Sequence, residues 1–335
     1  MNIREMTEVN EIKFLSPFAC RSTESQGRDV PEDECDIRTV FQRDRDRILH
    51  CKAFRRLKRK TQVFLAPEGD HYRTRLTHTL EVSQIARTIA RALRMNEDLT
   101  EAIALGHDLG HTPFGHCGER VLNEVSEEGF SHSRQSLRVV EKLENGGQGL
   151  NLTREVRDGI LNHSMGGSPS TMEGKIVRYA DKMAYIHHDM DDAIRAGILT
   201  EEGLPGEFTN VLGHSIKERL DVMIHSIIAS SLNQSSILMD PDVEDAMFGL
   251  RRYMFENLYK GSAAKAEEGK AEELVRRLYF YYMDHIESLP EEYLDRVWAG
   301  GETWSRAVCD YISGMTDSYA IHVYTELFVP KAWQY

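Results

Sequence analysis

A short stretch of the chain concentrates side chains that can bind a metal ion or move a proton. The segment GHDLGHTPFGH, residues 106–116, contains His107, Asp108, His111 and His116. Imidazole and carboxylate groups are common ligands of divalent cations. Histidine also titrates near neutral pH and therefore serves as an acid or a base. Because a single His-Asp pair is common in proteins, a site requires further residues from other parts of the chain.

Two such residues lie elsewhere. His78 shares helical spacing with the apolar residues that follow it up to Leu93, so we expect its side chain to point inward. Asp181 falls on one helical face with Val177 and Ala184, and a buried carboxylate is costly unless it is paired or metal-bound. These residues complete a candidate site for a divalent cation. Its ligands would be His78, His107, Asp108 and Asp181.

Each of these residues also has an ordinary explanation. A histidine on a packed helix face is commonly a core residue with satisfied hydrogen bonds. Asp181 is close enough in the sequence to Arg178 and Lys182 to form an ion pair. Spacing alone leaves both interpretations open.

The elements that would position these residues are almost all helical. Periodicity and turn residues predict helices near residues 37–60, 73–95, 98–110, 115–127, 132–145, 153–163, 173–197, 215–233, 240–261, 266–288 and 303–328. TQVFL, which begins at residue 61, is the best candidate for a strand. No internal repeat or interdomain linker is evident, so the sequence predicts an all-α fold. We expect an irregular N-terminal arm (1–36) and a single helical domain (37–335), with a core at about 60–200 and a C-terminal helical extension at about 201–335.

Composition narrows the class of protein. A net charge of −13 argues against general nucleic-acid binding. The five cysteines form no CxxC pair, which is typical of a reducing compartment. No apolar run is long enough to span a membrane, and the N-terminal residues have no signal-peptide core. We therefore expect a cytoplasmic protein without a membrane partner.

Residues 38–60 depart from the acidic average, with ten basic residues against two acidic ones. A solvated helix face would explain such a segment. A surface that binds the phosphate groups of a nucleotide or nucleic acid would explain it equally well. The sequence leaves both explanations open.

The amino-acid sequence around the candidate ligands resembles the bacterial deoxyguanosinetriphosphate triphosphohydrolase-like family of the HD-domain superfamily. His78, His107-Asp108 and Asp181 match the H…HD…D signature of that superfamily. The more specific similarity is carried by RTVFQRDRDRILHCKAFRRLKRKTQVF (38–64), RTRLTHTLEVSQIARTIARAL (73–93), EAIALGHDLGHTPFGHCGE (101–119), RYADKMAYIHHDMDDAIRAGIL (178–199) and GMTDSYA (314–320). The resemblance spans residues 26 to 330, approximately, and implies an HD-domain helical fold with additional C-terminal helices.

The resemblance implies a metal-dependent hydrolase that converts a dNTP, dGTP included, to a deoxynucleoside and triphosphate. The four ligands would hold Mn²⁺, Mg²⁺ or another transition metal, which activates water and polarises a phosphoryl oxygen. The departing 5′-oxygen needs a proton, and His116 is the candidate donor. Glu119 lies at i+3 from His116 on the same helix face. Similarity adds His132 to this group, although the family usually has Asn where this chain has Ser133.

The resemblance also implies substrate contacts and partners. It assigns Arg75, His111 and Lys182 to the phosphates, Tyr185 and Asp189 to the deoxyribose, and Gln62 to the 3′-hydroxyl. A 2′-deoxy preference would arise by steric exclusion beside Tyr185. The basic segment would bind either the substrate phosphates or an effector, namely a nucleotide or single-stranded DNA. Relatives form oligomers, and we expect a homo-oligomer, specifically a hexamer.

Two other function classes stay open on the sequence. One is a different HD enzyme, either a nucleoside monophosphatase or a cyclic-nucleotide or alarmone hydrolase. The other is a non-catalytic nucleotide or DNA sensor. The segments KTQVF, PFGH and DKMAY favour the dNTP enzyme over the first, and the intact ligands and the His116–Glu119 pair argue against the second. Base preference does not follow from the sequence.

Overall fold

The computed structural model describes residues 1–62, 73–164, 166–195, 197, 199–258 and 263–331. These residues are mainly helical, which confirms the predicted all-α class. The helices are α1 (Ile3–Phe14), α2 (Val40–His50), α3 (Lys52–Arg56), α4 (Arg75–Leu93), α5 (Glu97–Gly106), α6 (His116–Val125), α7 (His132–Arg138), α8 (Arg154–Asn162), α9 (Met172–Arg195), α10 (Gly206–Leu212), α11 (Ile216–Ser231), α12 (Pro241–Leu258), α13 (Ala263–Asp284), α14 (Glu291–Trp298), α15 (Trp304–Ser313) and α16 (Asp317–Phe328). Of the candidate strand at residue 61, only Thr61 and Gln62 are described, and Thr61 forms one isolated bridge with Thr74. None of the described helices combines the length and apolar character that crossing a membrane requires.

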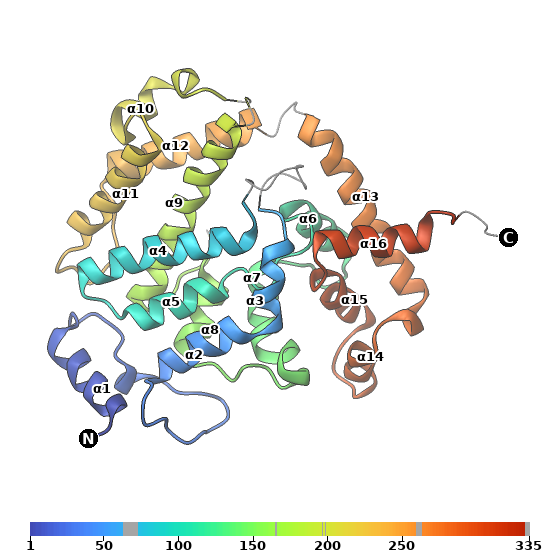
Figure 1. The fold of residues 1–335 in the computed structure, drawn as a ribbon, viewed down its shortest axis with the longest axis horizontal. Coiled ribbons are helices and arrows are strands. Elements are labelled where there is room, and N and C mark those ends of the chain that lie inside the picture. Colours follow the sequence, from blue (N-terminus) through green and yellow to red (C-terminus); the bar gives the residue numbers. More distant parts are fainter. Residues whose placement is uncertain (63–72, 165, 196, 198, 259–262, 332–335) are drawn as a thin grey trace.

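The helices gather around two hydrophobic clusters. Figure 1 shows α4, α5 and α9 at the centre, α10 to α12 together on one side, and α13 to α16 on the other. Buried side chains from α2, α4, α5, α8 and α9 continue into those of α11 and α12 to form the first cluster. The second cluster joins α6 to the helices from α13 to α16. Helix α6 therefore packs on the C-terminal end of the chain, although it follows α5 in sequence.

Helix α4 illustrates how the sequence specifies these elements. Thr74 and Thr77 form a capping box at its start, and Arg94 ends it in the left-handed conformation. Val82 and Ile89, which lie on the predicted apolar stripe, are fully buried. His78 on the same stripe is 2% exposed, so the predicted inward orientation is confirmed.

Some predicted boundaries differ from the observed ones. The helix predicted at 37–60 is broken at Cys51, which caps α3 through its sulfur, and the helix predicted at 303–328 is broken before Thr316, which caps α16. Residues 1–36 were expected to be irregular, but they contain α1, with a capping box formed by Asn2 and Glu5. Most apolar side chains of α1 are exposed, so no apolar stripe indicated this helix.

A buried ion pair attaches the N-terminal arm to the first cluster. Asp44 in α2 is completely buried and forms a salt bridge with Arg28 of the arm. The same carboxylate accepts hydrogen bonds from the Thr153 backbone N–H at 2.8 Å and from the Thr153 hydroxyl at 2.7 Å. The Arg28 guanidinium also donates to the Val40 carbonyl at 3.0 Å. Every charge in this junction is therefore compensated by a partner.

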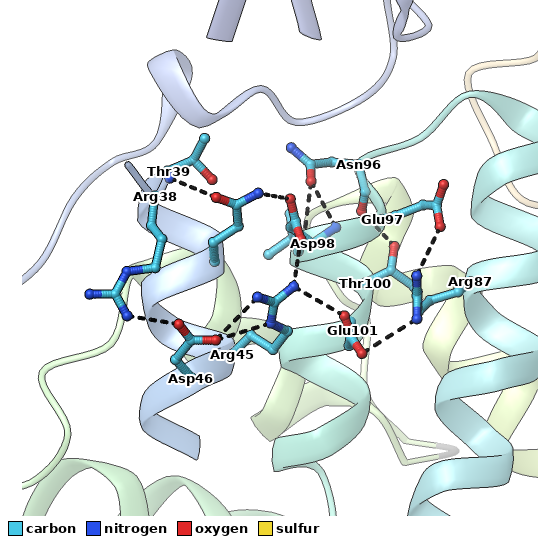
Figure 2. A network of polar contacts seen from close by, with 12 residues as sticks. Arg38, Thr39, Arg45, Asp46, Arg87, Asn96, Glu97, Asp98, Thr100 and Glu101 are labelled. Carbon is cyan, nitrogen blue, oxygen red and sulfur yellow. Dashed lines mark hydrogen bonds and ion pairs between the residues drawn. The ribbon is translucent and has the colours of Figure 1, made fainter. Parts of the chain in front are cut away.

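The exposed side of α2 carries a second ion-pair network (Figure 2). Arg38 contacts Asp46 at 2.8 Å, and Arg45 contacts Asp46 at 3.1 Å and Asp98 at 3.0 Å. Arg45 reaches Glu101 at 3.4 Å as well. Part of the basic segment 38–60 is thus a solvated helix face whose arginines are neutralised by acidic neighbours.

Replacing Asp44 with Ala is expected to destabilise the protein by about 3–5 kcal/mol, because it leaves the Arg28 charge buried and unpaired. Urea unfolding of the purified variant measures this loss. Asp46→Ala, two residues away in the same helix, is the matched control and is expected to cost about 1 kcal/mol or less, since its ion pairs are exposed to solvent. Equal losses in the two variants would refute the role given to burial.

Candidate active site

The four predicted metal ligands converge on one point. His78 comes from α4 and Asp181 from α9, while His107 and Asp108 follow the end of α5. His107 donates from Nδ1 to the Ala104 carbonyl at 2.7 Å, which turns its Nε2 toward the carboxylates. This Nε2 lies 3.5 Å from Asp108 Oδ1 and 3.6 Å from Asp181 Oδ1. His78 Nε2 lies 3.1 Å from the same Asp181 oxygen.

This arrangement fits a divalent cation. Ligand atoms about 2.0–2.2 Å from one ion lie about 3 Å or slightly more from each other, as these do. The Nε2 atom of His107 is buried and has no hydrogen-bond partner among the described residues. Burial opposes ionisation of Asp181, but the His78 hydrogen bond and the nearby His107 outweigh it, so the pKa of Asp181 lies below its ordinary value. The carboxylate is therefore charged and available to a cation at neutral pH.

A second group connects the proposed proton donor to a carboxylate. His116 is the first residue of α6, Glu119 lies one turn later, and His132 begins α7. His116 Nδ1 is 3.0 Å from Glu119 Oε2, and His132 Nδ1 is 2.8 Å from Glu119 Oε1. Burial opposes ionisation of Glu119, but hydrogen bonds from both histidines hold its pKa well below the ordinary value. Glu119 is therefore an ionised acceptor that orients both rings.

The segment before His116 needs an unusual backbone. Phe114 and Gly115 have φ values of 61° and 58°, in the region that favours glycine. A Cβ atom on Gly115 would lie 2.9 Å from the Arg75 guanidinium, so a larger residue would displace that side chain. Asp317, at the start of α16, accepts from the Phe114 N–H at 3.0 Å and from the Thr61 N–H at 2.9 Å. The C-terminal motif GMTDSYA thus holds two segments of the site together.

A cavity of about 250 Å³ adjoins both groups. Five of the six predicted substrate contacts line it, and Asp189 does not. The lining residues are Gln62, Arg75, His78, Asp108, His111, His116, His132, His163, Ser164, Asp181, Lys182, Tyr185 and Arg251. Asp189 is buried one turn after Tyr185, and burial raises the pKa of its carboxyl to about 8, against the effect of a hydrogen bond from Tyr185.

Cationic groups are among the residues that line this cavity. Arg75 Nη1 bonds Asp108 Oδ2 at 2.8 Å, while its Nε and Nη2 atoms have no partner among the described residues. Burial and the neighbouring Arg178 lower the pKa of Lys182 to about 8. His111 stacks on His132, with ring centroids 4.2 Å apart. The buried guanidinium of Arg75 therefore has donors to spare for an anionic ligand.

Known proteins resemble this chain over its whole length. A deoxyguanosinetriphosphate triphosphohydrolase-like protein of Caldanaerobacter subterraneus subsp. tengcongensis is 58% identical, with 99% of this chain and 98% of that protein covered. A protein of Clostridium tetani with the same description is 46% identical, covering 99% and 97%. The chain belongs to the deoxyguanosinetriphosphate triphosphohydrolase-like family. Its membership makes it an HD-domain phosphohydrolase, and therefore a hydrolase.

Family descriptions also match separate parts of this dGTPase-like chain. The HD domain matches residues 75–186, and the phosphohydrolase-associated domain matches residues 237–326. A crystal structure of a phosphohydrolase from Bacteroides thetaiotaomicron shares the fold, with a TM-score of 0.52, 18% identity, and 84% of this chain and 68% of that one covered. HD domains bind divalent metals, and His78, His107 and Asp108 of this dGTPase-like protein form one of the groups of described residues that could hold an ion.

Three cavity residues of this dGTPase-like protein were not among the predicted site residues, namely His163, Ser164 and Arg251. Arg251 comes from α12, and its guanidinium lies 5.7 Å from the centroid of the Tyr185 ring. In the sequence it stands beside Arg252 in a helix, a pattern typical of a solvated face. His163 follows α8 and lies 3.2 Å from His132, Nε2 to Nε2. Its only signal in the sequence was a histidine at the end of a helix next to the turn GGSPS.

Proposed function

We propose that this protein is a metal-dependent dNTP triphosphohydrolase, which converts a dNTP, dGTP included, to a deoxynucleoside and triphosphate. The observation that carries the proposal is a single cavity that joins three features. It is lined by three of the four proposed metal ligands, by the buried cations Arg75 and Lys182, and by His116, which a carboxylate orients. A phosphoryl transfer to water that expels an alkoxide needs all three.

In the proposed mechanism His78, His107, Asp108 and Asp181 hold Mn²⁺ or Mg²⁺, which when bound supplies an activated water and polarises a phosphoryl oxygen. Arg75, Lys182 and Arg251 bind the phosphate chain through charge-assisted hydrogen bonds. Water attacks the α-phosphorus and the bond to the 5′-oxygen breaks. His116 Nε2 donates the proton that this oxygen takes up, and Glu119 keeps the imidazole in position.

The sugar contacts follow from the same cavity. Tyr185 and Gln62 both line the cavity. In this proposal Tyr185 excludes a 2′-hydroxyl and Gln62 bonds the 3′-hydroxyl. Asp189 would act through Tyr185 rather than by direct contact, because it does not line the cavity. A preference for deoxynucleotides would therefore rest on steric exclusion by an aromatic ring.

The test is a product analysis with each of the four dNTPs and either Mn²⁺ or Mg²⁺. A deoxynucleoside and inorganic triphosphate in equal amounts support the proposal. Orthophosphate released from nucleoside monophosphates would instead identify another HD enzyme. If no substrate is turned over with any metal or added activator, the remaining interpretation is a non-catalytic nucleotide or DNA sensor.

We also infer a binding site for an effector, a nucleotide or single-stranded DNA, in the remaining part of the basic segment. A cavity of about 880 Å³ lies beside α3 and shares no lining residue with the candidate active site. Its walls combine five basic side chains with three tyrosines, which suit phosphates and stacked bases respectively. They are Lys52, Arg55, Arg56, Lys58, Arg59, Tyr293, Tyr311 and Tyr319.

The double variant Lys58→Ala/Arg59→Ala is expected to bind this effector about 10-fold more weakly or worse, since two phosphate contacts are lost. Fluorescence anisotropy with a labelled dNTP and a labelled oligonucleotide, each at two salt concentrations, distinguishes the two ligands. Arg38→Ala is the control, because Arg38 lies outside this cavity and pairs with Asp46 (Figure 2). Equal affinities for all three proteins would exclude this cavity as the effector site.

The proposed assembly is a homo-oligomer, and specifically a hexamer. Sedimentation equilibrium of the purified chain measures the mass of the particle directly. A mass equal to one chain of 38.4 kDa would refute this part of the proposal.

A further inference from the structure

His163 lies between the metal-ligand set and the histidine–carboxylate group. It is 1% exposed and follows the last residue of α8. Its ring centroid is 5.0 Å from that of His107 on one side and 5.2 Å from that of His132 on the other. The cavity is bounded by His163 but the mechanism above does not use it.

The hydrogen-bond partners of His163 and His132 determine which ring nitrogens carry hydrogens. His163 Nδ1 is 2.7 Å from the Ile160 carbonyl, which only accepts, so this nitrogen carries a hydrogen. At the other end His132 Nδ1 is 2.8 Å from the ionised Glu119 carboxylate, which also only accepts. The two Nε2 atoms face each other at 3.2 Å, and in the metal-free protein they form a hydrogen bond when one ring carries a hydrogen on both nitrogens. His132 is the ring that faces the ionised Glu119 carboxylate, so it is the one that carries both hydrogens and donates to His163 Nε2, which accepts.

The chain continues to the proton donor. Glu119 accepts from the backbone N–H of His132 at 2.8 Å as well as from its ring, so His132 and Glu119 hold each other at two points. The other Glu119 oxygen is 3.0 Å from His116 Nδ1. A fixed backbone carbonyl at Ile160 is thereby linked through two rings and one carboxylate to His116.

We propose that His163 is a positioning residue for the hydrolysis reaction: it holds His132, which fixes Glu119 against His116. This proposal rests on the proposed function for its kinetic consequences. Without the imidazole acceptor, His132 keeps only its contacts to Glu119 and can rotate about them, and the carboxylate loses its rigid support. A displacement of about 1 Å at a reacting group costs about 100-fold in rate.

The test compares His163→Phe, which keeps an aromatic ring of similar volume but has no acceptor, with His163→Gln, which offers an amide oxygen. His163→Phe is expected to lower kcat by about 10- to 100-fold. KM for the dNTP and the bound metal, measured by elemental analysis, are expected to stay within about twofold. His163→Gln is expected to recover most of kcat, a rescue that a purely structural role would not produce.

The double variant His132→Phe/His163→Phe tests whether His163 acts on the reaction through His132. If His163 acts through His132, the double variant loses no more kcat than His132→Phe alone. Additive losses would overturn the proposal in favour of a direct role for His163. Loss of bound metal in His163→Phe would overturn it too, because the effect would then pass through His107.

A measurement on the metal-free protein separates this proposal from the proposed function. Protein labelled with ¹⁵N-histidine is expected to show a nitrogen–nitrogen coupling across the His132–His163 hydrogen bond, and to lose it in His163→Phe. Absence of this coupling in the unaltered chain would overturn the positioning role whatever reaction is catalysed. If the protein shows the coupling but hydrolyses no dNTP, the proposed function is refuted, while the hydrogen bond between His132 and His163 is confirmed.

Discussion

His116→Ala is expected to lower kcat by about 10²- to 10⁴-fold while the protein keeps its metal. The imidazole is about half exposed and belongs to neither hydrophobic cluster, so its removal leaves both clusters intact. It donates no bond to His78, His107, Asp108 or Asp181. The loss therefore reflects the missing proton for the 5′-oxygen, measured as kcat together with the metal content of the purified variant.

Metal content decides between two roles for His116. Ring nitrogens of His111, His116 and His132 lie within 4.8 Å of each other and of a Glu119 oxygen, which is close enough to hold an ion. Loss of metal from His116→Ala would therefore assign His116 to a metal site and contradict the role of proton donor. His225→Ala, at an exposed histidine of α11, is the control and is expected to match the unaltered protein in both measurements.

Asp181→Ala is expected to lose metal binding, and to lose activity because the metal is lost. This is the opposite of His116→Ala, which is expected to lose activity and keep its metal. The Asp181 carboxylate oxygen lies 3.1 Å from His78 Nε2 and 3.6 Å from His107 Nε2, so it faces both histidines of the ligand set. Removing a group that only supports a ligand weakens metal affinity by about 10- to 100-fold. Removing the ligand itself is expected to weaken it further. Titration with Mn²⁺, followed by the activity recovered, measures the loss.

Excess metal separates the two variants. It is expected to restore part of the activity of Asp181→Ala and none of that of His116→Ala. Asp191→Ala, ten residues later in α9, is the matched control, because Asp191 pairs with Arg73 and not with the ligand set. Normal metal affinity in Asp181→Ala would show that this carboxylate is not a ligand.

Local periodicity was sufficient to predict that His78 and Asp181 face the core, whereas their convergence with His107 and Asp108 followed from the family resemblance. His78 and Asp181 each lie on an apolar helical stripe, and such a stripe faces the core in any helical fold. The His116–Glu119 contact likewise follows from a spacing of three within one helix. The two inward orientations and the His116–Glu119 contact each depend on a single helix, which is why the sequence was informative about them.

The remaining parts of the site depend on contacts between distant segments. Arg251 reaches the cavity only because α12 packs near α9, and His163 meets His132 only where α8 packs against α7. The basic segment shows the same limit, because its members have different environments. Lys60 is fully buried and donates to the carbonyls of His111 and Ser313, whereas Arg45 lies in a surface network. Composition alone could not distinguish the buried basic residues of this segment from the exposed ones.

The bonds of Asp317 bear on what can be cut away from this enzyme. The HD match ends at residue 186, yet the backbone before His116 and the backbone of Thr61 are both tied to a carboxylate more than 130 residues further on. Helix α6, which carries His116 and Glu119, packs on the same C-terminal helices. A fragment limited to the HD match would keep the four proposed metal ligands but lose the support of the proposed proton donor, His116. The catalytic unit is therefore the nearly full-length chain, and an exchange of C-terminal regions between relatives must bring the matching PFGH segment with it.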